Sequence, residues 1–313
     1  MQRYIVQRLL AFIPVVMFVG IFTFSLIHLA PGDPAALLGG QTGTREEIDK
    51  IRARLGLDKP LLQQFWIWTK ATLRGDLGES VMSRLPIREL IFQRLPPSLW
   101  IGGAAEIFAV LVGVPLGVLA AWKANSWIDR TAMVFAVLAF SVPSFYLAYN
   151  LIFLFAVKLQ LLPAIGYAPL SEGIGTWARS MVLPVVSIGL IIAGLLTRIT
   201  RATLLEVLRE DYIRTARAKG LAESTMLFRH ALKNAFAPIL TVIGLGIAGL
   251  ITGLVVTETV FAIPGIGRLV VDSIQRRDYP VIQGLMLMIA LSYMTINLFI
   301  DLLYAYIDPR IRY

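Results

Sequence analysis

Six long stretches of the chain are almost free of charged residues, and each has the length of a membrane-spanning helix. They lie between Arg8 and Asp33, Leu95 and Trp122, Arg130 and Lys158, Arg179 and Arg198, Lys233 and Glu258, and Asp278 and Asp301. A helix needs about 20 apolar residues to cross roughly 30 Å of hydrocarbon. The pattern therefore predicts an all-α membrane protein with six transmembrane helices.

The first stretch is predicted to stay in the protein. Its apolar run is longer than the roughly 7 to 15 residues of a signal-peptide core. The small-residue exit His28-Leu29-Ala30 is followed by Pro31, a poor context for cleavage. We therefore expect a retained first helix, and domain boundaries at 1–30, 31–97, 98–307 and 308–313.

Composition agrees with this prediction. Charged residues make up 16% of the chain, against about 25% in soluble domains. Cysteine is absent and histidine occurs only as His28 and His230, which leaves little material for disulfides, thiol catalysis or metal binding. The net charge of +9 fits basic inner loops better than nucleic-acid binding.

The distribution of Lys and Arg predicts the orientation. With the N-terminus inside, the inner segments are 1–8, 123–130, 198–233 and 308–313, and they hold most of the Lys and Arg of the short loops. Inner loops are enriched in these residues. Both termini are therefore expected in the cytoplasm.

The long outer segment, 31–97, is predicted to fold into helices. Thr44-Arg45-Glu46-Glu47 has the spacing of a capping box, and Gly56 can close the helix that follows. Pro60 begins a second helix that ends near Gly75, and residues 88–95 suggest a third before Pro96-Pro97. A hairpin on the membrane surface and a docking surface are both open readings.

No catalytic motif is present in the sequence. No lysine follows a glycine, so the P-loop motif G-x-x-x-x-G-K-S/T does not occur. The motifs G-x-S-x-G and H-E-x-x-H are also absent. The chain is expected to be non-catalytic. Energy for uphill transport would come from an ion gradient or from a partner.

Loop 198–233 is predicted to be a rigid basic protrusion. Leu204, Leu208 and Ile213 recur at helical spacing, so the fourth span is expected to continue as an amphipathic helix. Gly220 would end it, and a second helix from about Ser224 would carry the following residues on one face: Leu227, Phe228, Ala231 and Leu232. From these residues alone, a partner-binding loop and a surface for anionic lipid are equally open.

The loop's sequence decides between these two readings through a resemblance. Tyr212-Ile213-Arg214-Thr215-Ala216-Arg217-Ala218-Lys219-Gly220-Leu221 and the run from Arg229 to Ala235 resemble the cytoplasmic "EAA" loop of binding-protein-dependent ABC importers. Ala216 and Gly220 match the second alanine and the glycine of that loop. Arg214 and Thr215 replace its first Glu and Ala, and His230 and Lys233 replace its later Ile and Pro, which is typical of the dipeptide/oligopeptide permease family.

Other segments of the chain carry the same resemblance. They are His28 to Pro34, Leu55 to Pro60, Arg74 to Gly78, Arg94 to Ser98, Val260 to Arg268, Arg277 to Pro280 and Asp308 to Tyr313. Together they are typical of the first permease subunit of this family. The resemblance implies the transmembrane domain of a type I ABC importer in a bacterial or archaeal inner membrane.

The resemblance also implies partners and contact residues. The expected partners are a second similar permease, two P-loop ATPases that bind ATP and Mg, and an extracytoplasmic solute-binding protein; no cofactor is expected in this chain. The implied ATPase contacts are Arg214, Thr215, Ala216, Arg217, Ala218, Lys219, Gly220 and Leu221. Di- and oligopeptides are the expected substrates, with nickel, glutathione or oligosaccharide as alternatives. An autonomous secondary transporter is disfavoured, because paired mid-membrane carboxylates and an inverted repeat are missing.

Polar residues within the spans are candidates for function, since charges are costly there. Glu106 is a candidate for the translocation path, with a structural bond to a neighbouring helix as the alternative. Glu258, at the outer end of the fifth span, and Pro264, Gly265 and Gly267 beyond it are candidates for an outer gate or a binding-protein contact.

Prolines and glycines predict kinks and close packing. Pro115, Pro143 and Pro184 lie inside spans, where missing backbone bonds allow kinks. Gly249 and Gly253 form a G-x-x-x-G motif, which favours close contact with another helix in this chain or in the second permease.

Overall fold

The computed structural model describes residues 2–29, 35, 44–54 and 56–307. The long elements of this part of the chain are all helices. They form two compact units, Met1–Pro96 with Arg268–Thr295 and Pro97–Gly267 with Ile296–Tyr313. The chain is therefore an all-α protein, and each unit is described by itself.

Five helices among the described residues are long and apolar enough to cross a membrane. They are α1 (Gln2–Leu29), α5 (Ile87–Trp122), α8 (Ile174–Val207), α11 (Leu232–Val260) and α13 (Tyr279–Ile307). These five correspond to the first, second, fourth, fifth and sixth predicted spans, and Pro184 lies inside α8 without ending it.

The third predicted span is broken rather than kinked. Trp127–Ser141 and Ser144–Lys158 meet at an angle of 103°, and they make a sixth span only if the bent pair is counted as one. The pair consists of α6 (Trp127–Ser141), α7 (Ser144–Leu151) and the π-helix η1 (Ile152–Lys158). Val142 is extended, because the ring of Pro143 disfavours helical geometry in the residue before it.

The first unit contains the predicted outer helices α3 (Arg45–Arg54) and α4 (Leu61–Leu73). Gly56 has φ +67°, and hydrogen bonds from Gly56 N to Ala53 O (3.2 Å) and from Leu57 N to Arg52 O (2.9 Å) close α3. This is the Schellman arrangement that favours glycine. The side chain of Glu47 lies outside the described residues, so the capping box stays a prediction.

Aromatic contacts hold α4 against α1 within this unit. The ring of Phe24 lies 5.3 Å from that of Phe65 and 5.9 Å from that of Trp68. The opposite side of α4 leaves Leu62 and Trp66 exposed. An apolar exposed face of this kind suits a membrane interface and a protein contact alike, so the surface hairpin and the docking surface both stay predictions.

The start of α13 is also tied to the outer segment. Asp278 accepts hydrogen bonds from Ser80 Oγ (2.6 Å), Val81 N (3.3 Å) and Met82 N (3.4 Å). Gln283 Nε2 donates to Thr23 O of α1 at 3.0 Å. These bonds make the first unit one folded body rather than a helix with a loose loop.

The predicted third outer helix does not end at Pro96-Pro97. It continues through both prolines as the first part of α5. Proline removes the hydrogen bond to the carbonyl four residues earlier. The carbonyls concerned belong to Phe92 and Gln93, which are exposed. The helix therefore tolerates both prolines, and the prediction of a separate helix is wrong.

The second unit is built around α8, which packs against α5, α6, α7 and α11. A methyl group at Gly113 of α5 would lie 2.7 Å from Ala193 O, and one at Gly117 would lie 2.7 Å from Thr197 O. A methyl group at Gly194 of α8 would lie 2.7 Å from Ala136 O of α6. These three glycines let the helix backbones meet closely.

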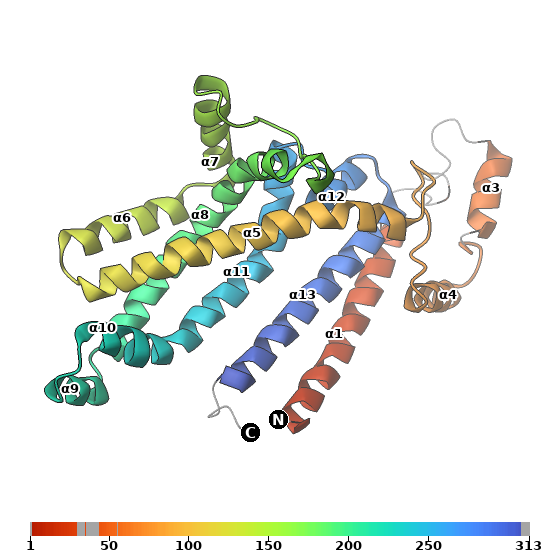
Figure 1. The fold of residues 1–313 in the computed structure, drawn as a ribbon. Helices are drawn as coiled ribbons and strands as arrows, with labels where there is room; N and C mark the ends of the chain where they lie inside the picture. Colours follow the sequence, from red (N-terminus) through yellow and green to blue (C-terminus); the bar gives the residue numbers. More distant parts are fainter. Residues whose placement is uncertain (1, 30–34, 36–43, 55, 308–313) are drawn as a thin grey trace. The chain divides into compact units, whose positions relative to one another are not determined.

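Short elements complete the second unit. The 3-10 helix η2 (Leu170–Glu172) precedes α8, while α9 (Asp211–Ala218), α10 (Glu223–Thr225) and the π-helix η3 (Met226–Ala231) link α8 to α11. In Figure 1, α9 and α10 lie at the same end of this unit as the turn between α5 and α6. The helix α12 (Ile266–Gln275) follows α11 in the sequence, and from Arg268 onward it belongs to the first unit.

Candidate functional site

Loop 198–233 is a folded helical protrusion. α8 continues past the predicted end of the span, to Val207, and then stops. Glu210 is extended (ψ 148°) and begins α9. The predicted uninterrupted helix through Ile213 is therefore wrong. The break turns α9 so that Ile213 is completely buried, whereas a continuous helix would carry this side chain away from the core.

Buried apolar side chains hold the protrusion on the helix ends. Ile213 of α9 and Leu227 of η3 share one core cluster with Val118 of α5 and Leu204 of α8. Each fully buried side chain of this size contributes about 1.5–3 kcal/mol. Ala235 and Ile239 of α11 belong to the same cluster. The loop is therefore packed on three helices of the second unit, which agrees with the predicted folded protrusion.

The face predicted for the second loop helix is partly wrong. Leu227 and Ala231 are buried, but Phe228 is 56% exposed and Met226 is buried instead. Residues 226–231 form a π-helix, which has more residues per turn than an α-helix. Met226 and Ala231, five residues apart, therefore share the buried side, and Phe228 points outward.

The predicted ATPase contacts form the exposed surface of α9 and its C-terminal turn. Ala216 is half-buried and the other seven are exposed: Arg214, Thr215, Arg217, Ala218, Lys219, Gly220 and Leu221. Arg214 also forms an ion pair with Asp211, one turn earlier. The structure brings these residues together on one surface, and their contact with an ATPase stays a prediction.

Gly220 supplies the backbone geometry of that surface. Its φ is +77°, its N–H donates to Arg217 O at 3.0 Å, and Leu221 N donates to Ala216 O at 3.3 Å. This is a Schellman closure, which places glycine in the left-handed region. The predicted helix end at Gly220 is confirmed.

An ion pair at the root of the loop, nearly buried at Asp129 and partly exposed at Arg201, was not predicted from the sequence. Arg201 of α8 donates from Nε to Asp129 Oδ1 (2.5 Å) and from Nη2 to Oδ2 (2.7 Å). In the sequence, Arg201 is one of several basic residues of the inner segment 198–233. Ser126-x-x-Asp129 has the spacing of a helix cap before an apolar run, which marks Asp129 as a structured residue but does not point to Arg201.

Glu106 is buried in the second unit. Its carboxylate lies against Gly246 of α11: a methyl group at Gly246 would be 2.9 Å from Oε2 and 3.2 Å from the side chain of Ile192 of α8. Neither carboxylate oxygen has a hydrogen-bond partner among the described residues. The bond to a neighbouring helix that the sequence left open is therefore not made there. A role in the translocation path stays a prediction.

The Glu258 cluster, defined as Ser98, Glu258, Gly265, Ile266 and Gly267, lies at the opposite end of α11 from loop 198–233. Glu258 is completely buried and accepts a hydrogen bond from Ser98 Oγ at 2.5 Å. Ser98 Oγ in turn accepts from Ile266 N at 2.8 Å. Gly265 packs directly on the Glu258 carboxylate, where a methyl group would collide with it.

The burial of this cluster limits what its members can touch. Glu258, Gly265 and Gly267 are buried and Pro264 is half-buried. In this conformation the cluster locks the turn after α11 and offers little surface to a binding protein. A part in an outer gate stays a prediction.

The two G-x-x-x-G motifs that lie in described helices have different surroundings. Gly113 and Gly117 let α5 pack closely against α8. This contact was not predicted, although these two glycines have the same spacing as Gly249 and Gly253. Within the described residues, nothing lies within 4 Å of a methyl group placed at Gly249 or Gly253. The predicted close packing at Gly249 and Gly253 is therefore not made inside the described part of this chain.

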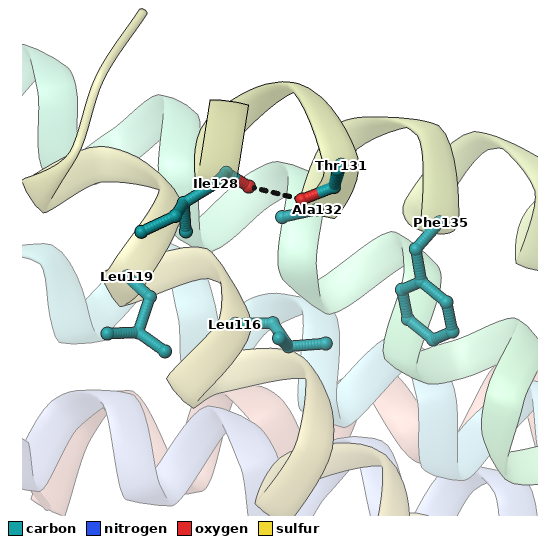
Figure 2. Close-up of a pocket in the computed structure, with 6 residues that line it drawn as sticks. All are labelled: Leu116, Leu119, Ile128, Thr131, Ala132 and Phe135. Carbon is teal, nitrogen blue, oxygen red and sulfur yellow. Dashed lines mark hydrogen bonds between the residues drawn. The ribbon is translucent and has the colours of Figure 1, made fainter. Parts of the chain in front are cut away.

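One apolar pocket of about 290 Å³ lies between α5 and α6 (Figure 2). It is lined by Leu116, Leu119, Ile128, Thr131, Ala132 and Phe135. The hydroxyl of Thr131 donates to Ile128 O at 3.0 Å, so its donor is already used. Substrate sites need a few free polar groups to orient a ligand, and this pocket does not supply them. Among the described residues, no group of His, Asp or Glu has the arrangement of a metal site.

The fold and the loop define a class: a polytopic all-α membrane protein with a folded helical loop at one end of its helices. Residues 1–100 match the family "Binding-prot-dependent transport system membrane comp, N-term", and residues 113–313 match "Binding-protein-dependent transport system inner membrane component". The chain belongs to this family of inner-membrane transport components. The family resemblance expected from the sequence is confirmed.

Relatives and solved structures agree with this assignment. The chain is 48% identical over 313 residues, the whole of both chains, to the "Probable peptide ABC transporter permease protein y4tP" of Sinorhizobium fredii. It is 42% identical, again over both whole chains, to the "Glutathione transport system permease protein GsiC" of Escherichia coli. A structure of the MetNI methionine ABC transporter in an inward-facing conformation has a TM-score of 0.58, 18% identity, and coverage of 70% of this chain and 96% of that one. This last likeness supports the fold alone.

Proposed function

We propose that this chain is the first permease subunit of an ATP-driven importer for di- and oligopeptides, with both termini in the cytoplasm. It would contribute half of the transmembrane pathway and one coupling loop. ATP binding would close two ATPase subunits, move the coupling loops together and open the pathway outward. Hydrolysis and product release would reset it.

The exposed surface on α9 is the observation that carries this proposal. Buried anchors at Ile213 and Leu227 fix the loop to the helix ends, while seven of the eight predicted contact residues stay exposed. A rigid loop can transmit a displacement, whereas a slack loop would absorb it. ATP and Mg would bind to the ATPases, so no cofactor is assigned to this chain.

A second permease would cover the open face of α11. Gly249 and Gly253 have room for close helix contact that the described part of this chain does not fill. Small residues at this spacing let two membrane helices approach closely. We therefore place the second permease against this face. The solute-binding protein would dock at the outer side and deliver the substrate.

Peptide is the favoured substrate class because of the relative named as a peptide permease, at 48% identity. Glutathione is the second candidate, because the relative that bears its name is 42% identical over its whole length. Nickel and oligosaccharide are further alternatives, and no feature of the described residues favours them.

The test begins with a pull-down of the tagged chain in mild detergent. We expect a second permease and P-loop ATPases to co-purify with it. The purified complex is then reconstituted in liposomes with its binding protein, and uptake of labelled dipeptides, oligopeptides and glutathione is measured with and without ATP. Faster ATP-dependent uptake of peptides than of glutathione supports the proposal. If the tagged chain is recovered without these partners and transports substrate unaided, the proposal is contradicted and an autonomous transporter is favoured.

A further inference from the structure

We propose that Asp129 and Arg201 form a latch that makes the turn between α5 and α6 move together with loop 198–233. Both are positioning residues for coupling, and this inference rests on the proposed function. The loop would thus be joined to the bundle through α5 and α6 as well as through α8 and α11, the two helices that flank it in the sequence.

The geometry of the latch is that of a strong ion pair. Both carboxylate oxygens of Asp129 are bonded to Arg201, at 2.5 and 2.7 Å, in a two-point arrangement. Only 5% of the Asp129 side chain and 25% of the Arg201 side chain are exposed. Paired donors of this kind fix orientation as well as distance. Separating the pair would leave the nearly buried Asp129 carboxylate without its main partner, which is costly, so we expect the two helices to move together.

Asp129 is itself built into the turn. Its Oδ2 accepts a hydrogen bond from Asn125 N at 2.8 Å, and its own N–H donates to Ser126 Oγ at 3.4 Å. Asn125 has φ +64°, and Ser126 caps α6. One carboxylate therefore holds both the start of α6 and the last part of α8.

Two further contacts join the same turn to the loop. Trp122 Nε1 donates to Glu223 Oε2 of α10 at 3.2 Å. Val118 and Ala121, just before this turn, share a core cluster with Ile213 and Leu227 of the loop. The polar and apolar contacts act between the same two segments, so the latch is one part of a continuous interface.

The far side of α6 shows what the latch would move. Gly194 of α8 packs on Ala136 of α6, and the guanidinium of Arg198 lies 5.8 Å from the ring centre of Phe140. α6 then ends at the break before Pro143, and α7 continues at 103° in contact with α8 and α11. A displacement of the loop would therefore reach α7 through α6. α8 packs against both α6 and α7 along this route.

The test uses the reconstituted complex of the preceding section and counts substrate molecules taken up per ATP hydrolysed. Variants are Arg201→Gln, Arg201→Lys and the double variant Asp129→Asn with Arg201→Gln, which leaves no unpaired buried charge. The matched control is Arg130→Gln, which removes one exposed positive charge beside Asp129. Assembly with the ATPases is checked for each by pull-down.

We expect ATP hydrolysis to persist in Arg201→Gln and in the double variant, and uptake per ATP to fall roughly fivefold or more. A fivefold change is about the lower end of the coupling measured between distant sites in proteins. Arg201→Lys should fall less, because it keeps the charge but loses the two-point bond. Arg130→Gln should couple as the unmodified chain does. Normal coupling in an assembled double variant would overturn the latch and leave the proposed function intact, whereas absence of ATP-driven uptake by the unmodified complex would overturn the function itself.

A second measurement avoids changing the latch. The chain has no cysteine, so one variant with both Lys123→Cys and Arg209→Cys carries spin labels at these two positions only. Lys123 lies on the exposed turn between α5 and α6, and Arg209 lies in the exposed loop before α9. The latch predicts that the distance between the labels stays constant through the ATP cycle. A distance that changes between the nucleotide-free and ATP-bound complexes would contradict it, even if the latch variants fail to assemble.

Discussion

The two ends of α11 use buried residues in opposite ways. At one end, loop 198–233 buries Ile213 and Leu227 and keeps its predicted contact residues on the surface. At the other end, the Glu258 cluster buries its charged and polar groups and bonds them to each other. The first arrangement leaves an exposed surface on which a partner contact is predicted, and the second closes the chain on itself. Both ends carry motifs of the same family, but only the first exposes its motif.

This difference predicts separate consequences for substitutions at the two ends. Changes to buried residues should reduce stability at either end. Changes to exposed residues of α9 should leave stability intact and reduce coupling. The predictions below are ordered by the expected loss of folding free energy.

The largest loss is expected for Ile213→Ala. Removing a buried isoleucine side chain typically costs about 2–5 kcal/mol, because a cavity remains. The loop should loosen from the helix ends, and the thermal unfolding midpoint of the detergent-solubilised chain should fall. Arg214→Ala, at the exposed next position, should change that midpoint little. Equal midpoints for the two variants would contradict the assignment of Ile213 as the anchor.

A smaller loss is expected for Gly265→Ala at the Glu258 cluster. The added methyl group collides with the Glu258 carboxylate, and overpacking of this kind costs about 1–3 kcal/mol. Protease resistance of the chain in native membranes would measure the effect. Gly175→Ala, where the methyl group meets nothing within 4 Å, is the control. Unchanged resistance in Gly265→Ala would show that the turn after α11 is less tightly packed than described.

The smallest loss of stability, with a large loss of coupling, is expected for Gly220→Pro. Proline cannot adopt the φ of +77°, and it removes the N–H that bonds Arg217 O. A misfit with the left-handed region typically costs an L-residue about 1–2 kcal/mol and is confined here to an exposed turn, so the bundle should survive while ATP hydrolysis no longer drives uptake. Gly220→Asn is the control, because asparagine tolerates the left-handed region. Normal uptake per ATP in Gly220→Pro would mean that this turn is not part of the coupling contact.

Much of this architecture was predictable from the sequence because the membrane imposes a simple rule. Five spans, the outer helices α3 and α4, and the helix end at Gly220 follow from hydrophobic length, glycine and proline placement. The resemblance predicted which residues form the coupling surface, and the structure shows that most of these residues are exposed.

The parts that the sequence did not reveal depend on contacts between distant residues. The 103° break at Pro143 looks like an ordinary kink in the sequence, and the π-helix at 226–231 has no sequence signal that we could use. The Asp129–Arg201 pair joins residues 72 positions apart, and periodicity cannot report such a partner. Gly113-x-x-x-Gly117 has the spacing of a helix-packing motif, but Pro115 between the two glycines predicts a kink, and the close packing of α5 on α8 was not predicted.

The most direct test of the central claim is cross-linking from α9. Thr215→Cys places one thiol on the exposed coupling surface of a cysteine-free chain, and Arg276→Cys places one on the exposed segment between α12 and α13. Each variant is treated in native membranes with a short thiol-to-amine cross-linker, and the products are identified by mass spectrometry. The account predicts that Thr215→Cys cross-links to a P-loop ATPase and that Arg276→Cys does not. Cross-linking of Arg276→Cys to the ATPase, or its absence from Thr215→Cys in a complex that contains the ATPase, would contradict the account.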